Sequence, residues 1–384
     1  MSRIVFRFMT IGVVVLLLSL LAPLAGVLQS RALASGGEGF VVVGTGLNSP
    51  RGLTFGPDGN IYVAEAGLGG SNSTIGQCQQ VPGAPTGPGP YTGGYTARIS
   101  EVDQYGMRST VVDHLPSATS HEQGSAEYIG VSDVKFLGHQ LYALLSGGGC
   151  SHGNPNTPNG IIRVERGEHE WDLVANLSHY IQTHPVKHPN AGDFEPDGTW
   201  YSMVARGNSL YAVEPNHGEL DRIKLFGDRD DTGDSIISRV IDISASQGHA
   251  VPTASTFYKG NFYVTTFTGA YLPGVANVYK ITPWGQISVV VSGLPEIILG
   301  ITFDSQGRMY LLEPFPTGVS PIGHGVVVRT NQSGGFDTVV EGLTLPTAMT
   351  FGPDGRLYIS NFGISLSPTG GDGQVVRSTN PLNV

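Results

Sequence analysis

Three glutamates end similar short runs, each with tyrosine in second place: IYVAE at Glu65, LYAVE at Glu214 and MYLLE at Glu313. A fourth run, LYISN, ends at Asn361. A ring of these carboxylate and amide oxygens could hold Ca²⁺, which accepts about six to eight such ligands, or a cationic or hydroxylated substrate. Acids held close together raise one another's pKa, which suits acid-base chemistry. The alternative is that each acid bonds neighbouring backbone or faces water.

Histidines are concentrated in one part of the chain, because eight of the 11 lie between His114 and His188. His121 in SHEQGS and His152 in CSHGN are the candidates for contact with a ligand. The spacing of His184 and His188 does not indicate a helical zinc site, since two prolines in HPVKHPN prevent a regular helix. Hydrogen-bonded or solvated histidines are the alternative for the whole group.

Cys78 and Cys150 are the two cysteines of the chain. In an oxidising compartment an isolated pair favours a disulfide, and two free thiols are the alternative. The sequence contains no GxSxG nucleophile elbow, no Walker A motif and no dinucleotide-binding glycine motif before a helix. The motifs therefore indicate no particular reaction.

Composition limits the class of protein. Charged residues are 14% of the chain, the net charge is −10, and hydrophobic residues are 40%. The hydrophobic content is enough for a folded core. The negative charge argues against nucleic-acid binding, which depends on neutralising phosphates.

The elements that must position these residues form a repeat. A strand, a glycine-containing turn and a second strand recur six times, most clearly as SPRGLTFGPDGNIYVAE from Ser49 and LPTAMTFGPDGRLYISN from Leu345. Third and fourth strands follow, but the last unit lacks the fourth, and an unassigned strand, FVVVGTGL, begins at Phe40. This pattern predicts an all-β, six-bladed β-propeller with four-stranded blades, in which the N-terminal strand completes the last blade. A β-sandwich with a second domain is the alternative.

Residues 1–34 are expected to be a signal peptide. Arg3 and Arg7 precede an apolar stretch, and Ala32-Leu33-Ala34 supplies a cleavage site. An uncleaved membrane anchor is the alternative, because the apolar stretch is about long enough to span a bilayer. Under either interpretation, residues 35–384 are expected to form a single domain that lies outside the cytoplasm, as a secreted, periplasmic or cell-surface protein.

The repeat is lengthened by four insertions, and all of them fall on one face of the predicted propeller. We call them the lid loops: residues 66–96, 116–127, 146–160 and 178–199. Both cysteines lie in lid loops, and Arg51 precedes the first strand on the same side. Long loops on a rigid scaffold commonly carry binding function. Arg51, Glu65, Glu214, Glu313, Asn361, His121 and His152 are the resulting candidate ligand-binding residues.

Three segments resemble the ScyD/ScyE family: VVVGTGLNSPRGLTFGPDGNIYVAEAGLGG, FEPDGTWYSMVARGNSLYAVEPNHGEL and LPTAMTFGPDGRLYISNFG. The resemblance implies an exported NHL- or TolB-like six-bladed propeller without an established biochemical role, so it transfers no catalytic residue. The arrangement also resembles gluconolactonase propellers, which hold a divalent cation with Glu, Asn and Asp. Glu65, Glu214, Glu313 and Asn361 match that set in blade position and residue type only, and fold does not imply function.

The sequence favours an exported propeller that binds a small molecule or a partner protein on the lid face. The alternative is a metal-dependent, lactonase-like hydrolase that uses the acidic ring, with Ca²⁺ as its possible cofactor. A cell-surface scaffold without a small ligand is a third reading. Nucleic acid is not expected as a partner, and a membrane only through an uncleaved N-terminal segment.

Overall fold

The computed structural model describes residues 39–83, 87–120, 127–165, 170–226, 235–267, 274–316 and 323–383. The expected export segment, residues 1–34, and His121 lie outside these ranges. Across the described ranges, no helix has the length and apolar character needed to cross a membrane.

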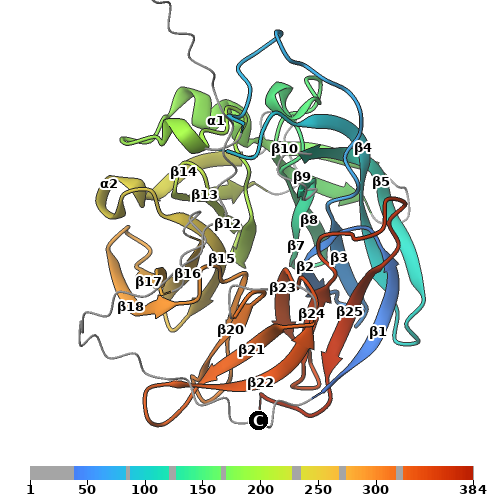
Figure 1. The fold of residues 1–384 in the computed structure, drawn as a ribbon, viewed down its shortest axis with the longest axis vertical. Helices are drawn as coiled ribbons and strands as arrows, with labels where there is room; N and C mark the ends of the chain where they lie inside the picture. Colours follow the sequence, from blue (N-terminus) through green and yellow to red (C-terminus); the bar gives the residue numbers. More distant parts are fainter. Residues whose placement is uncertain are drawn as a thin grey trace, which may run out of the picture. The chain divides into compact units, whose positions relative to one another are not determined.

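Six antiparallel sheets surround a common axis (Figure 1). Their first strands contact one another in the order β2, β7, β11, β15, β19, β23 and back to β2. The chain is therefore a six-bladed β-propeller, as the repeat predicts.

Blades 1 to 3 carry the longer loops. Blade 1 contains β2 (Pro50–Phe55), β3 (Ile61–Glu65), β4 (Thr92–Val102), β5 (Arg108–Ser120) and β6 (Glu127–Ile129). Blade 2 contains β7 (Val131–Leu137), β8 (Gln140–Leu145), β9 (Gly160–Glu165) and β10 (Glu170–Asn176). Blade 3 contains β11 (Ser202–Arg206), β12 (Ser209–Glu214), β13 (Glu219–Leu225) and β14 (Ser235–Asp242).

Blades 4 to 6 follow the repeat more closely. Blade 4 contains β15 (Val251–Tyr258), β16 (Asn261–Phe267), β17 (Ala276–Ile281) and β18 (Ile287–Leu294). Blade 5 contains β19 (Gly300–Phe303), β20 (Met309–Glu313), β21 (Gly325–Thr330) and β22 (Phe336–Leu343). Blade 6 contains β23 (Ala348–Phe351), β24 (Leu357–Asn361), β25 (Gly373–Ser378) and the N-terminal β1 (Phe40–Leu47).

The ring is closed by its first strand. β1 pairs antiparallel with β25, with Phe40 opposite Ser378 and Leu47 opposite Gly373. This pairing ties the beginning of the described chain to its last blade, and a propeller leaves only short, protected sheet edges. The predicted completion of the last blade by the N-terminal strand is confirmed.

Two details of the lid differ from the sequence prediction. Residues 116–120 of the predicted loop 116–127 are strand, because β5 extends to Ser120, and Glu127 begins β6, which makes blade 1 five-stranded. Three short helices also lie in or beside the predicted loops 146–160 and 178–199: η2 (Cys150–His152), α1 (Leu177–Thr183) and η3 (Ala191–Asp193). A fourth, α2 (Ser244–Gln247), connects blades 3 and 4. These helices are too short for their apolar period to be read from the sequence.

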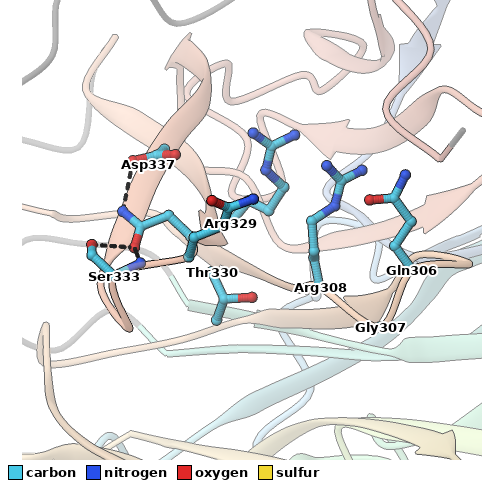
Figure 2. Close-up of a pocket in the computed structure, with 9 residues that line it drawn as sticks. Gln306, Gly307, Arg308, Arg329, Thr330, Ser333 and Asp337 are labelled. Atoms are coloured by element: carbon cyan, nitrogen blue, oxygen red, sulfur yellow. Dashed lines mark hydrogen bonds between the residues drawn. The ribbon is translucent and has the colours of Figure 1, made fainter.

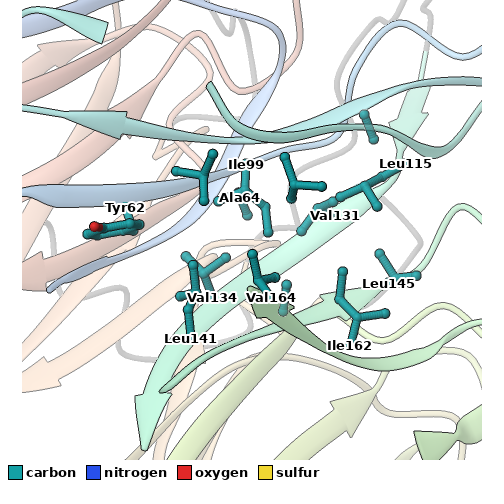
Figure 3. Close-up of a cluster of buried hydrophobic side chains, with 14 residues drawn as sticks. Tyr62, Ala64, Ile99, Leu115, Val131, Val134, Leu141, Leu145, Ile162 and Val164 are labelled. Atoms are coloured by element: carbon teal, nitrogen blue, oxygen red, sulfur yellow. The ribbon is translucent and has the colours of Figure 1, made fainter. Parts of the chain in front are cut away.

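Apolar side chains fill the spaces between neighbouring blades. Figure 3 shows the cluster between blades 1 and 2, where Ile99, Val134, Leu141 and Val164 are almost completely buried. Each such side chain contributes about 1.5–3 kcal/mol through its removal from water.

Hydroxyl groups join the blades nearer the axis. Each donates to a main-chain carbonyl in the first-strand segment of the next blade, which suits the small residues of the repeat. The pairs are Ser146 with Trp200, Ser202 with Thr253, Thr253 with Ile298, Thr347 with Pro50 and Ser360 with Arg51.

Candidate functional site on the lid face

Glu65, at the end of β3, is fully buried and is held within its own blade. Its carboxylate accepts from the Asn48 main-chain N–H at 2.5 Å and from the Ser100 hydroxyl. Arg98 completes the pair, with Nε 2.8 Å from one carboxylate oxygen and Nη2 2.8 Å from the other. These contacts occupy both oxygens of Glu65.

Glu214, at the end of β12, is also fully buried. It accepts from the main-chain N–H groups of Thr199 at 2.9 Å and His217 at 2.6 Å, and His217 Nδ1 lies 3.1 Å away. Burial raises the pKa of Glu214, but His217 and the two N–H groups lower it more, so the net pKa lies below its usual range. Glu214 is therefore an ionised structural carboxylate.

One structural role is common to this position of the repeat. In blades 1, 3 and 6 the residue that ends the second strand accepts the N–H of the segment entering that blade, from Asn48 to Glu65, Thr199 to Glu214, and Thr344 to Asn361 at 2.7 Å. A carboxylate or amide oxygen is needed there because a buried N–H without a partner is costly. The signal that suggested a shared ring of oxygens thus reports a repeated backbone contact.

The predicted calcium cluster is not formed. Glu313 is fully buried at the end of β20, but among the residues that the structure describes, no three His, Cys, Asp or Glu side chains gather closely enough to hold a metal ion. Glu65, Glu214, Glu313 and Asn361 therefore do not make the predicted shared site. Glu65, Glu214 and Asn361 each accept a main-chain N–H from the segment that enters their own blade instead.

Two other side chains cross the ring at its lid end. Tyr201, just before β11 in blade 3, donates its hydroxyl to the carbonyl of Thr347 in blade 6, the opposite blade, at 2.9 Å. Arg51 of β2 donates to the carbonyls of Gly363 at 3.0 Å and Tyr128 at 2.5 Å. Burial lowers the pKa of Arg51 and raises that of Tyr201, so a polar centre of low solvation lies where the first strands begin.

Glu127 is an acid whose charge interacts with Arg51 of this polar centre. It is exposed to solvent at the start of β6, and Tyr91 donates a hydrogen bond to its Oε2 at 3.1 Å. Desolvation by the surrounding protein and the charge of Glu195 raise the pKa of Glu127, against the smaller effects of Tyr91 and Arg51. A carboxyl with a raised pKa that still meets solvent can exchange a proton or bind a ligand.

His152 packs against Tyr91, the hydrogen-bond donor to Glu127. It is fully buried, its Nε2 lies 2.7 Å from Glu195 Oε2, and its Nδ1 lies 2.6 Å from the Gly148 carbonyl oxygen. Desolvation lowers the pKa of His152, but Glu195 and the carbonyl raise it more. Its ring meets Tyr91 edge to face, with centroids 5.3 Å apart. His152 was predicted to contact a ligand; in the structure both of its ring nitrogens have protein partners and its ring packs against Tyr91.

The lid loops that carry these residues are tied together. The predicted disulfide between Cys78 and Cys150 is formed, joining the loop after β3 to the loop after β8. Asp197 accepts from the Ser151 N–H at 2.8 Å and the Ser151 hydroxyl at 2.6 Å, which adds the loop before β11. Three insertions far apart in the sequence therefore form one support for Tyr91, Glu127 and His152.

We call Arg51, Tyr91, Glu127, His152, Glu195 and Tyr201 the lid-face cluster. Arg51 and His152 were predicted as site residues, whereas the other four were missed. Glu127 is the last residue of one predicted lid loop, and Tyr91 and Glu195 lie inside two others. The sequence could therefore have suggested these three as site residues only because they are one aromatic and two acidic residues within insertions. Nothing in the local pattern indicates that Tyr201 reaches the opposite blade.

No protein-family model and no curated protein matches the chain. Solved structures are similar over most of its length. A calcium-binding regucalcin from Agrobacterium tumefaciens is 13% identical, with 89% of this chain and 94% of that chain covered and a TM-score of 0.49. A gluconolactonase from Xanthomonas campestris is 12% identical, with 88% and 89% covered and a TM-score of 0.49. At these values the similarity says nothing about what this chain binds or catalyses.

Proposed function

We propose that this chain is an exported β-propeller of the ScyD/ScyE type that binds a small hydroxylated or cationic molecule at the lid-face cluster. The observation that carries the proposal is the Glu127 carboxyl, which is exposed at the start of β6 and accepts a hydrogen bond from the Tyr91 hydroxyl. A donor group on a ligand would complete its hydrogen bonding. The three resemblance segments and the N-terminal pattern support the family type and the export.

The structure of the lid supports a role in binding. Its loops are joined by a disulfide and by buried hydrogen bonds, so the cluster is held in place before a ligand arrives. Preorganisation of this kind reduces the ordering cost of binding.

Thermal-shift titration of the purified chain tests the proposal, with D-glucose, glucono-1,5-lactone and choline as probes. At least one probe is expected to raise the melting temperature saturably, and Glu127→Gln is expected to abolish the shift. Glu170→Gln is the matched control, because Glu170 is an exposed acid on the outer strand β10. Absence of any saturable shift, or an equal response of wild type and Glu127→Gln, would contradict the proposal.

The same preparation tests the hydrolase alternative. The acids on which that alternative depends are bonded to neighbouring backbone and side chains, so no specific contact favours it. Calcium-dependent hydrolysis of glucono-1,5-lactone that disappears in Glu214→Gln would restore it. Recovery of the mature chain outside the cytoplasm, with its N-terminus identified by mass spectrometry, tests the export.

A further inference from the structure

A second polar site lies on the opposite face of the propeller. Because strands alternate in direction, the turn between β19 and β20 and the turn between β21 and β22 both lie away from the lid. They border a groove of about 640 Å³ in blade 5. Figure 2 shows its lining, which includes Gln306, Arg308, Arg329, Asn331, Ser333 and Asp337. Ligand sites in proteins commonly have volumes of this order.

Arg329 is the distinctive residue of the groove. Its guanidinium lies over the ring of Tyr310, 6.0 Å from the centroid. Its Nε is buried and, within the described part of the chain, has no hydrogen-bond partner. A buried donor without a partner is unfavourable, but the Nε atom of Arg377 is in the same state. What sets Arg329 apart from Arg163 and Arg377 is that, among the described residues, its guanidinium meets the Tyr310 side chain and no carboxylate.

Arginines at the same place in other blades have nearer partners. Arg163 lies 3.0 Å from Asp172, Arg222 donates to Ser209 at 3.1 Å, and Arg377 lies 3.8 Å from Asp354. Each of them, like Arg329, pairs across its sheet with a tyrosine of the second strand. The difference in blade 5 therefore arises from its neighbours and not from its position in the repeat.

Blade 5 differs because its acids are already occupied. Asp304 accepts from Arg308 Nε at 2.5 Å and from the Tyr310 hydroxyl at 3.1 Å. Asp337, opposite Arg329 in the sheet, accepts from the Asn331 amide at 2.8 Å. Arg308 also donates to the carbonyl of Leu382 at 3.2 Å. Asp304 thus serves Arg308 and leaves Arg329 without a carboxylate.

We propose that this groove binds a sugar acid, with its carboxylate on Arg329 and Arg308 and its hydroxyls among Gln306, Ser333 and Asp337. A guanidinium fork matches a planar carboxylate. Asp304 and Asp337 balance the two arginines in charge, so the groove favours a singly charged ligand over a polyanion. Asp337 would accept hydrogen bonds from the hydroxyl groups of a sugar. A simple anion has no hydroxyl group to donate to it. The site is separate from the lid-face cluster.

Calorimetric titration of the full chain with D-glucuronate and D-galacturonate, at constant ionic strength, tests this proposal. At least one uronate is expected to bind saturably at millimolar concentration, whereas D-glucose binds more weakly in this groove. Arg329→Gln is expected to weaken uronate binding by about tenfold or more, since a charge-assisted hydrogen bond is lost. Arg377→Gln is the matched control, because it changes the same position in blade 6.

The outcomes separate this site from the lid. Uronate binding lost in Arg329→Gln but retained in Arg377→Gln and Glu127→Gln supports the groove. The proposal is overturned if neither uronate binds, if Arg329→Gln binds as wild type does, if both arginine variants lose binding equally, or if heparin displaces the uronate at equimolar concentration. Uronate binding lost only in Glu127→Gln would also overturn it and would place the ligand on the lid face.

Discussion

Blades 1–3 and blades 4–6 share one sequence repeat, but their buried polar groups have different kinds of hydrogen-bond partner. In the first half, Glu65, Glu214 and His152 meet charged partners or several donors at once. In the second half, Thr265 and Asn361 serve the same regions with neutral hydrogen bonds. At the end of the second strand, blades 1 and 3 therefore hold a carboxylate in a charged network, whereas blade 6 uses a neutral contact. The ion pairs of blades 5 and 6 lie at the other end of the sheets, as in Arg308 with Asp304.

The difference indicates what the insertions do. They bring residues distant in sequence, such as Tyr91 and Glu195, against the same histidine. Low local dielectric strengthens such contacts and also makes an unpaired member costly. Substitutions in the first half should accordingly destabilise the protein more than the matching substitutions in the second.

Glu65→Ala should have the largest effect, a loss of about 3–5 kcal/mol of unfolding free energy, because removing one member of a buried ion pair leaves Arg98 uncompensated. Denaturant unfolding measures it. A loss below about 1 kcal/mol, typical of an exposed ion pair, would contradict the network described for blade 1.

Loss of the disulfide should come next. Cys78→Ser combined with Cys150→Ser frees a segment of 72 residues, which should lower stability by about 2–4 kcal/mol through the greater freedom of the unfolded chain. Thermal unfolding with and without reductant measures this. Reductant should affect the wild type and leave the double variant unchanged, and equal sensitivity of both would argue against the bridge.

A smaller, pH-dependent effect is expected in blade 3. Burial, with Arg239 opposing and Glu214 adding, raises the pKa of Glu219 from 4.5 to about 7. A carboxyl with a higher pKa in the folded state binds its proton more tightly there, so its contribution to stability falls as pH rises from about 4.5 to about 7. Glu219→Gln should remove this part of the pH dependence. An unchanged slope in chemical unfolding across that range would show that Glu219 does not titrate as expected.

Asn361→Ala tests the second half at the position equivalent to Glu65. It removes a neutral hydrogen bond from the Thr344 N–H, and an expected loss of about 1–2 kcal/mol follows from leaving that donor unsatisfied. The same denaturant series applies. A loss as large as that of Glu65→Ala would remove the distinction between the two halves.

Arg329→Gln should have the smallest effect, within about 0.5 kcal/mol, because Arg329 makes no hydrogen bond through Nε and no ion pair is found for it among the described residues. Thermal unfolding without ligand measures it. A marked destabilisation would mean that Arg329 serves the fold, and it would weaken the comparison with the other third-strand arginines.

The fold was predictable because the repeat is a local signal. A strand of alternating apolar and polar residues, a glycine turn and a tyrosine can be recognised within a few residues. The turn also has a direct physical cause, because Asp58 accepts from the Tyr62 hydroxyl at 2.7 Å and Gly59 takes a φ of 83°. The missing fourth strand of the last unit then predicted the closure by β1. The disulfide was also predictable, since the chain offers a single pair of cysteines.

The site was less predictable because equivalent positions in a repeat need not share an environment. Glu65, Glu214 and Asn361 were correctly aligned, but the prediction that they form one oxygen cluster was wrong, since each meets the backbone N–H that enters its own blade. His152 was correctly placed in the lid, and its contact with a ligand stays a prediction, although both ring nitrogens have protein partners. Its partner Glu195 is 43 residues away, and no periodicity relates them.

By itself, the sequence determined the six blades, their order, the strand that closes them and the loops that depart from the repeat, because these depend on patterns within a few residues. Only the tertiary structure decided which acids are neutralised, that Tyr201 reaches across the ring to Thr347, and that Arg163 and Arg377 approach a carboxylate whereas Arg329 has none among the described residues. Charge pairing depends on distances of a few ångströms between segments remote in the chain, and those distances exist only once the ring has closed.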